Sequence, residues 1–328
     1  MHYEEMEMSK IAVIALGGNS LIKDKAHQTV EDQYAAAYES CLHIAELVEA
    51  GYNVALTHGN GPQVGFILLR SELARHKIHE VPLDACGADT QGALGYAFQR
   101  ALGNILKKKG IDKQIVSVVT QVLVDKNDTG FKNPTKPIGE FYTKEEIEER
   151  KKADNWDIVE DAGRGWRRVV ASPIPLEIIE EKAIKALLDQ GFIVVSVGGG
   201  GIPVIRDDNG DLQGVAAVID KDYASSLLAS NIKADLFIIS TAVEKIYINF
   251  GKEDQKALDF VMLDELKKYK EEGHFKKGSM LPKVEAIIKF LENGGKKAIV
   301  TNPENIGKAV EGRTGTHITI NKEAGVTH

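Results

Sequence analysis

Short apolar runs of five or six residues alternate along the chain with longer segments in which apolar side chains recur at every third or fourth position. The first run, 11–16, contains no polar residue and ends at Gly17, so it predicts a strand that is buried on both faces. The following segment predicts a helix that ends at Gly51. Its regularly spaced residues are Tyr34, Ala37, Tyr38, Cys41, Ala45 and Val48. The next strand is expected at 53–57, which completes a strand–helix–strand unit.

The same alternation continues through most of the chain. Further strands are expected at 115–119, 193–197, 236–240, 246–249 and 297–301, and further helices at 62–75, 177–189, 223–230 and 282–292. Strands that alternate with helices are typical of a largely parallel sheet covered by helices on both faces. We therefore predict an α/β fold with a mainly parallel central sheet.

The segment 124–169 interrupts this alternation. It is polar, contains Pro134 and Pro137, and includes a strongly charged helix expected at 144–152. Two interpretations stay open on this pattern: an inserted subdomain or lid, and a long surface loop that the fold tolerates.

The composition and charge exclude several classes of protein. A chain of 328 residues with 43% hydrophobic and 27% charged residues is typical of a globular protein. Its net charge of −7 argues against nonspecific nucleic-acid binding, because phosphate contacts need a basic surface. Only two cysteines, Cys41 and Cys86, are present, which favours the reducing cytoplasm over a disulfide framework. No apolar stretch approaches the roughly 18 to 20 residues of a membrane span, so no membrane association is expected.

Three glycine-rich turns follow expected strands and are the first candidates for a ligand site. They are Gly17-Gly18-Asn19, Gly59-Asn60-Gly61-Pro62 and Gly198-Gly199-Gly200-Gly201. In an open parallel sheet the carboxyl ends of the strands form the ligand crevice, so the turns should gather at one edge. A tight-turn requirement explains each turn alone, but together they predict a cradle for a phosphate-sized anion. Neither the P-loop motif nor the dinucleotide-binding GxGxxG motif is present, so if a nucleotide binds, it is held in another way.

Charged residues stand at two further helix starts. Asp220, Lys221 and Asp222 follow the apolar run 215–219, at what is expected to be another strand-to-helix junction. A helix cap with solvated charges explains this group equally well. Lys283 stands in the first turn of the helix at 282–292, where a lysine opposes the helix dipole, and this placement indicates a functional role.

Histidine-based catalysis has little support in the sequence. His58 lies beside the second glycine turn, but no serine or cysteine stands in a nucleophile elbow. We therefore assign His58 a structural role.

Several sequence blocks, read in order, resemble the amino acid kinase superfamily and, within it, the carbamate kinase family. The blocks are ALGGN at 15–19, HGNGPQVG at 58–65, NPTKPIG at 133–139, EDAGRGWR at 160–167, GGGGIPV at 198–204, VIDKD at 218–222, GHF at 273–275 and GSMLPK at 278–283. The likeness extends from about residue 10 to about residue 320.

This resemblance implies the amino-acid-kinase fold, an open αβα sandwich with a central sheet of eight strands, for the whole chain as a single domain. An amino-terminal lobe, 9–215, would bind carbamate or carbamoyl phosphate, and a carboxy-terminal lobe, 216–320, would bind the nucleotide. The segment 124–169 would be a protruding subdomain, or lid, within the first lobe. The resemblance also implies a homodimer joined through the amino-terminal lobe.

The resemblance also implies roles for individual residues. The catalytic set would be Lys136, Lys221, Asp222 and Lys283. The set that binds the phosphoryl group and the acceptor would be Gly17, Gly18, Asn19, Gly59, Asn60, Gly61, Gly199, Gly200 and Arg164. The set that binds the nucleotide would be Thr241, Lys245, Tyr247, Met280 and Lys283. In the wider superfamily a lysine precedes the first glycine turn, but here Ala15 stands there, and Lys136 is expected to replace it.

The implied reaction is reversible phosphoryl transfer between ATP and carbamate, run toward ATP synthesis in arginine or related nitrogen catabolism. Carbamate is already an anion, so the enzyme must mainly position two negative species and neutralise charge. Mg²⁺ would bridge the phosphates through phosphate and water oxygens, with no metal ligand from the protein. The alternatives are an acetylglutamate or uridylate kinase, against which Ala15 and the NPTK block argue, and a non-catalytic sensor of carbamoyl phosphate or nucleotide. The retained catalytic set argues against the sensor.

Overall fold

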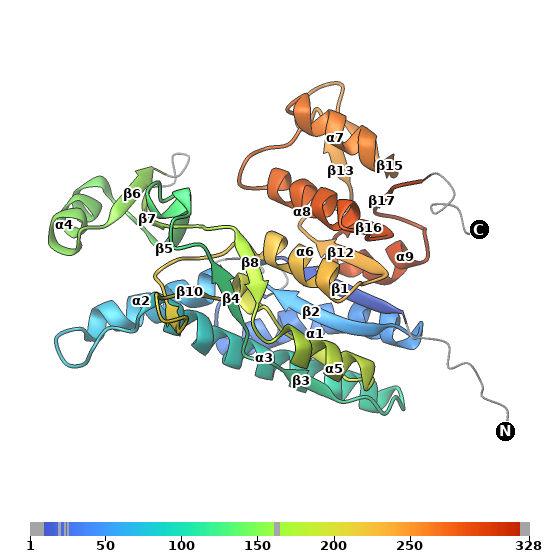
Figure 1. Cartoon of the computed structure of the whole chain (residues 1–328), viewed down its shortest axis with the longest axis horizontal. Helices are drawn as coiled ribbons and strands as arrows, with labels where there is room; N and C mark the ends of the chain where they lie inside the picture. Colours follow the sequence, from blue (N-terminus) through green and yellow to red (C-terminus); the bar gives the residue numbers. More distant parts are fainter. Residues whose placement is uncertain (1–9, 19–20, 23, 25, 161–164, 322–328) are drawn as a thin grey trace.

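The computed structural model describes residues 10–321 except 19–20, 23, 25 and 161–164. In this part of the chain the central sheet has eight strands in the order β15-β17-β16-β12-β1-β2-β9-β3 (Figure 1). Their bounds are β15 Phe260–Met262, β17 Thr316–Thr319, β16 Lys297–Thr301, β12 Leu236–Ser240, β1 Ile11–Leu16, β2 Asn53–His58, β9 Ile193–Val195 and β3 Ile115–Ser117. Neighbouring strands run parallel except β16 and β17, which are antiparallel. The predicted α/β class with a mainly parallel sheet is confirmed.

Alternate residues of β1 enter two separate apolar cores, one on each face of the sheet. Ile11, Val13 and Ala15 belong to one core, and Ala12, Ile14 and Leu16 belong to the other. The first core is closed by α5 (Glu181–Asp189), α6 (Lys221–Asn231) and α8 (Met280–Glu292), and the second by α1 (Val30–Glu49), α3 (Leu83–Lys108) and α9 (Ile306–Val310). This burial on both faces explains why the run 11–16 contains no polar residue.

A second sheet lies beside the carboxyl ends of the central strands. Its order is β11-β10-β4-β8, with bounds β11 Leu212–Gly214, β10 Ile202–Arg206, β4 Gln121–Val124 and β8 Pro175–Ile178. The remaining elements of the main body are α2 (Gly61–Ala74), α7 (Leu263–Glu271), and a ribbon of β13 (Ile246–Ile248) with β14 (Lys256–Leu258). The glycine turn 198–201 connects β9 of the central sheet to β10 of the second sheet.

The strand expected at 246–249 is confirmed as β13, although it pairs with β14 and lies outside the central sheet. Two other expectations about elements are wrong. The helix expected at 177–189 begins only at Glu181, because 177–178 belong to β8, whose end pairs with β4. The run 215–219 is not a strand, since Ala217 alone forms an isolated bridge, to Ala171.

The 26-residue helix α3 has no counterpart among the expected elements. Four glycines, at 87, 92, 95 and 103, interrupt its apolar stripe and hide the helical period. At least one of them serves close packing: a Cβ on Gly95 would lie 2.1 Å from the Ser117 hydroxyl oxygen. The helix can therefore approach β3 closely, and the same glycine weakens the sequence signal.

The interrupting segment forms a small unit of its own, at the left of Figure 1. It contains β5 (Lys136–Tyr142), α4 (Lys144–Asp154), β6 (Asp157–Glu160) and β7 (Trp166–Val170), with the strands in the antiparallel order β5-β7-β6. Thr143 begins α4 with a capping box. The unit contacts α2 through an ion pair of 2.6 Å between Arg150 and Glu72. The surface-loop interpretation does not account for this secondary structure.

Candidate active site

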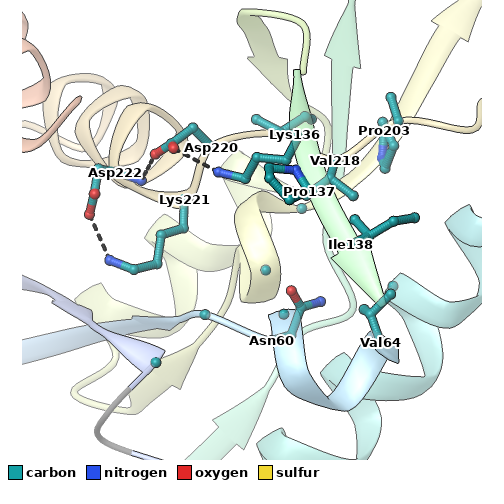
Figure 2. Close-up of a pocket in the computed structure, with 18 of the residues that line it drawn as sticks. Asn60, Val64, Lys136, Pro137, Ile138, Pro203, Val218, Asp220, Lys221 and Asp222 are labelled. Carbon is teal, nitrogen blue, oxygen red and sulfur yellow. Dashed lines mark hydrogen bonds and ion pairs between the residues drawn. The ribbon is translucent and has the colours of Figure 1, made fainter. Parts of the chain in front are cut away.

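A cavity of about 310 Å³ opens where the carboxyl ends of β1 and β2 meet the turn 198–201 (Figure 2). Its polar and glycine lining comes from all three glycine turns, the starts of α6 and α8, α3 and the inserted unit, namely Gly18, Gly59, Asn60, Gly61, Gly87, Gly199, Gly201, Lys136, Asp220, Lys221, Asp222, Gly278 and Lys283. A second cavity of about 140 Å³ shares Gly18, Lys221 and Lys283 with the first, and adds Gly17 and Thr241. The three turns therefore do meet at one edge of the sheet.

Two turn positions require glycine because other groups approach them closely. A Cβ on Gly17 would lie 2.9 Å from the Ser240 carbonyl oxygen. A Cβ on Gly199, where φ is +69°, would lie 2.1 Å from the Asn60 amide nitrogen. Asn60 in turn donates a hydrogen bond of 2.8 Å to the Thr90 hydroxyl. The second and third turns are thus packed directly against each other, and their backbone lines the cavity.

Asp222 holds two of the lysines at the cavity wall. Its two carboxylate oxygens lie 2.6 Å from Lys221 Nζ and 3.0 Å from Lys283 Nζ. Asp222 is 3% exposed and stands in the first turn of α6, whereas Lys283 stands in the first turn of α8. One buried carboxylate therefore places two ammonium groups from different helices side by side.

The protonation state of Asp222 follows from these contacts. Burial by itself raises the pKa of Asp222, but the charges and hydrogen bonds of Lys221 and Lys283 outweigh it and lower the pKa to about 2. Asp222 is therefore ionised at neutral pH and is a poor general base. It balances one of the two ammonium charges, so this trio retains a net positive charge for an anion.

The third lysine reaches the same helix start from the inserted unit. Lys136 Nζ lies 2.9 Å from Asp220 Oδ2, and Asp220 Oδ1 accepts a hydrogen bond of 2.9 Å from the backbone N–H of Asp222 (Figure 2). Asp220 is thus both the N-cap of α6 and the partner of Lys136. Three ammonium groups, two carboxylates and the positive end of the α6 dipole give the cavity a net attraction for anions.

His58 lies directly beneath the cavity and has a structural role, as expected. Its side chain is buried, and its Nδ1 lies 3.0 Å from the Gly59 carbonyl oxygen. Burial lowers the pKa of His58 to about 4, with a smaller contribution from the positive charge of Lys221. The imidazole is therefore neutral at physiological pH. A Cβ on Gly198 would lie 2.6 Å from His58 Nε2, so the ring packs against the third glycine turn.

Several residues assigned to the site from the sequence are not among those that line either cavity. Lys245 forms an ion pair of 2.6 Å with Asp259. Tyr247 packs against Phe250, with 5.9 Å between ring centroids. Met280 packs against the apolar core under α8. Their assignment to the nucleotide stays a prediction, whereas Thr241 lines the smaller cavity.

Three further residues assigned to the site from the sequence are not among the described residues that line either cavity. Gly200 faces the main chain beneath the turn, since a Cβ there would lie 2.4 Å from the Ile219 carbonyl oxygen. Asn19 and Arg164 lie outside the described residues.

The apolar part of the lining could not be predicted from the sequence. Val64, Leu83, Ile138, Pro203 and Val218 line the larger cavity, and Asp220 adds its contact with Lys136. Apolar residues carry no chemical signature in a sequence, so only the tertiary structure distinguishes them from core residues. The sequence indicated Asp220 as a helix cap. Its other role, as the partner of Lys136, depends on a contact between residues 84 positions apart in the chain.

Among the described residues, no helix is long and apolar enough to cross a membrane. No cluster of three or more histidine, cysteine, aspartate or glutamate side chains with the geometry for a metal ion occurs there either.

The lowered pKa of Asp222 predicts how stability depends on pH. Because the pKa falls from 3.8 to about 2 on folding, the carboxylate stabilises the fold by about 2 kcal/mol above pH 4, and this contribution is lost as the pH falls toward 2. Asp222→Asn should therefore be less stable than the wild type at pH 6, and the gap should narrow by about 1 kcal/mol at pH 3. Urea unfolding at both pH values measures the gap. Asp112→Asn makes the same change at an exposed position and is the control. A gap for Asp222→Asn that does not change with pH would contradict the assignment.

Comparison with known proteins gives a consistent result. Residues 10–302 match the model of the amino acid kinase family. A carbamate kinase of Clostridium perfringens is 51% identical over 312 residues, which cover 93% of this chain and 98% of that protein. The carbamate kinase-like protein YahI of Escherichia coli is 53% identical over 314 residues, which cover 95% of this chain and 99% of that protein. Among solved structures, the carbamate kinase of Giardia lamblia bound to AMP-PNP superposes with a TM-score of 0.89 at 42% identity, covering 95% of this chain and 98% of that one.

Proposed function

The chain belongs to the amino acid kinase family and, within it, to the carbamate kinases, and we propose that it transfers a phosphoryl group reversibly between ATP and carbamate. One observation carries the proposal: Lys136, Lys221 and Lys283 surround two aspartates at a cavity whose wall also includes Asn60 and several glycines. Such a site attracts and orients anions, and both of its aspartates are already paired with lysines. Phosphoryl transfer to an acceptor that is already ionised needs this arrangement.

The reaction balances without proton transfer. In the direction from ATP, a carbamate oxygen forms a bond to the γ-phosphorus while the bond from that phosphorus to the β,γ-bridging oxygen breaks. ADP leaves with the electron pair of the broken bond, and carbamoyl phosphate forms. The negative charge spreads over the oxygens of the moving group, where preorganised ammonium groups stabilise it most. An ionised Asp222 holds two of those ammonium groups in place.

We assign the larger cavity to carbamate and the transferred phosphoryl group, and the smaller cavity to the nucleotide. The larger cavity is lined by Lys136 and the second and third glycine turns, and the smaller one includes Thr241. Lys221 and Lys283 line both cavities, so they lie where the phosphoryl group passes from one substrate to the other. This assignment supports an acceptor lobe at 9–215, a nucleotide lobe at 216–320 and a lid at 124–169.

The carboxylates of the site indicate how Mg²⁺ would be accommodated. Asp220 and Asp222 each lie within 3.0 Å of a lysine, which leaves the protein few free carboxylate oxygens for a cation. These residues fit a Mg²⁺ ion that arrives with the nucleotide and is held by phosphate and water oxygens. When bound there, the ion neutralises charge on the β- and γ-phosphates.

Ala15 argues against an acetylglutamate or uridylate kinase. It is fully buried in the core on the α6 side of the sheet, at the place where a lysine is expected in the wider superfamily. Lys136 supplies a cation to the cavity from the inserted unit instead. The presence of Lys136 at the cavity, together with alanine at position 15, favours carbamate over acetylglutamate or UMP as the acceptor.

The chemistry of carbamoyl phosphate favours one direction of the reaction, and the two cysteines favour one cellular compartment. Carbamoyl phosphate is a mixed anhydride with a high phosphoryl-transfer potential, so we propose that the enzyme runs toward ATP synthesis, in arginine or related nitrogen catabolism. Cys41 and Cys86 are both free thiols and both buried, which is consistent with the cytoplasm.

We also propose that the enzyme is a homodimer joined through the amino-terminal lobe. The helix α3 presents an exposed face there that includes Ala93 and Tyr96, the latter 60% exposed. The Arg100 guanidinium lies 3.7 Å from the Tyr34 ring centroid and 5.1 Å from that of Tyr96. Ordered aromatic and arginine side chains on one face are typical of interface cores. Sedimentation equilibrium should give the mass of two chains for the wild type and a shift toward one chain for Tyr96→Glu. A wild type that stays monomeric at tens of micromolar would contradict the proposal.

A coupled assay of ATP formation from ADP and carbamoyl phosphate, with Mg²⁺, tests the proposed function. Acetylglutamate with ATP, and UMP with ATP, are the control reactions. We expect turnover with carbamoyl phosphate and none above background in either control. Absence of turnover with carbamoyl phosphate, or faster turnover in a control, would overturn the proposal.

A further inference from the structure

A buried glutamine on α3 contacts the third glycine turn from behind the cavity. Gln91 is 2% exposed and is not among the residues that line either cavity. Its side-chain amide nitrogen donates hydrogen bonds of 3.0 Å to the Gly198 carbonyl oxygen and 3.1 Å to the Thr120 carbonyl oxygen. Its side-chain oxygen accepts a hydrogen bond of 2.7 Å from the Thr120 backbone N–H. The side-chain amide of Gln91 thus forms hydrogen bonds with three main-chain groups.

Through Thr120 the same amide reaches both ends of the turn. The Thr120 hydroxyl accepts a hydrogen bond of 3.0 Å from the backbone N–H of Val197, which precedes the turn. The Thr120 carbonyl oxygen accepts one of 2.9 Å from the backbone N–H of Ile202, which follows it. Gln91 and Thr120 together therefore form a clamp around 197–202, and Thr120 is fully buried as well.

The clamp holds a strained segment. Val197 has φ of +52° and ψ of +32°, in the left-handed region that a β-branched residue rarely adopts. Such a conformation persists only where surrounding contacts enforce it. The hydrogen bond from Val197 to Thr120 and the bond from Gln91 to Gly198 are contacts of this kind. Without them we expect the turn to relax away from its position.

The position of the turn matters because its backbone is cavity wall. Gly199 and Gly201 line the larger cavity, and Gly199 packs against Asn60, which lines the cavity too. Asn60 is itself bonded to Thr90, the residue next to Gln91 on α3. Two adjacent side chains of one helix therefore fix two glycine turns relative to each other. When a group that positions a substrate is displaced by about 1 Å, the reaction rate can fall by a factor on the order of 10².

We infer that Gln91 is a positioning residue for phosphoryl transfer, which holds the Gly198–Gly201 turn against the acceptor through its side-chain amide. This inference rests on the proposed function, because it assigns the turn to the acceptor side of the reaction. It adds a residue from a helix that contributes no charge to the cavity. Substitution of Gln91 should therefore be selective. It should impair the use of carbamoyl phosphate and leave the binding of ADP unchanged.

The test compares Gln91→Met with Gln99→Met. Methionine preserves the length and flexibility of glutamine and removes its hydrogen bonds. Gln99 lies two turns farther along α3, where its amide donates a hydrogen bond of 3.0 Å to the Ile115 carbonyl oxygen, at the far end of β3 from the cavity. The control therefore also removes a bond from a side chain of α3 to main chain. Thr120→Val, which removes the acceptor for Val197, is a second variant in case Gln91→Met fails to fold.

Steady-state kinetics supply the first measurement. For Gln91→Met we expect kcat/KM for carbamoyl phosphate to fall at least tenfold, while the Kd for ADP stays within about twofold of wild type. Thr120→Val should show a smaller fall in kcat/KM for carbamoyl phosphate, again with little change in the Kd for ADP. Gln99→Met should be less stable than the wild type but should not show this selective loss. Wild-type kinetics in Gln91→Met and Thr120→Val would overturn the inference. So would a loss that affects both substrates equally and matches the loss in Gln99→Met.

Hydrogen exchange of the backbone supplies a second measurement that does not depend on the reaction. Amides in 197–202 should exchange at least tenfold faster in Gln91→Met than in the wild type, and at the wild-type rate in Gln99→Met. If the wild type shows no turnover with carbamoyl phosphate, the proposed function fails, and exchange alone then decides whether Gln91 positions the turn. Unchanged exchange at 197–202 in Gln91→Met would overturn the inference.

Discussion

We expect the Lys283→Ala variant to lower kcat for phosphoryl transfer by at least about 10²- to 10³-fold, the cost of losing one preorganised group that stabilises transition-state charge. Lys283 Nζ lies 3.0 Å from Asp222 Oδ2, and the residue lines both cavities, so its charge faces the path of the phosphoryl group. Alanine removes this charge and leaves Asp222 paired with Lys221 alone. Initial rates of ATP formation at saturating ADP and carbamoyl phosphate measure the effect.

Lys289→Ala is the matched control for this prediction. Lys289 lies on the same helix, α8, is exposed, and places its ammonium group 5.1 Å from the Tyr223 ring centroid. Its kcat should stay within about twofold of wild type, because its charge does not reach either cavity. Full activity in Lys283→Ala would contradict the catalytic role. An equal loss in both variants would instead indicate a disturbed helix.

The parts of the site that could be predicted are those with a local signature. Glycine after an apolar run indicates a tight turn at the end of a strand, and the rule that ligands bind at the carboxyl ends of parallel strands brings the three turns together. Lys283 was visible because a lysine in the first turn of a helix is electrostatically unfavourable. The structure pairs it with Asp222, whose negative charge resolves that conflict.

The parts that could not be predicted depend on contacts between distant segments. Gln91 lies on a helix whose glycines hide its period, and a single glutamine has no pattern that marks it as buried. The run 215–219 looked like a strand because it is apolar, but part of it lines the larger cavity and Ile219 packs in the core. Apolar composition indicates burial in both cases, and only the tertiary structure shows whether a sheet neighbour is available.

The contact between Lys136 and Asp220 shows how the inserted unit completes the site. Lys136 begins β5 in that unit, whereas Asp220 caps α6 in the main body, and the pair is 2.9 Å apart. The larger cavity includes Lys136, while the described lining of the smaller cavity includes Lys221 and Lys283 without it. The inserted unit therefore contributes charge to the cavity that we assign to the acceptor, and its removal should affect the two substrates differently.

We expect Lys136→Ala to lower kcat by at least about 10²- to 10³-fold while the Kd for ADP, measured by calorimetry, stays within about twofold of wild type. The variant loses the cation that the inserted unit supplies to the larger cavity, so charge would be left unbalanced in the cavity that we assign to carbamoyl phosphate. Lys152→Ala, at an exposed position of α4 in the same unit, should match the wild type in both measurements. Undiminished turnover in Lys136→Ala would show that the inserted unit supplies no essential charge. A loss of ADP affinity as large as the loss of turnover would show that Lys136 serves the nucleotide, because the loss of a cation that contacts only the acceptor should leave ADP binding intact.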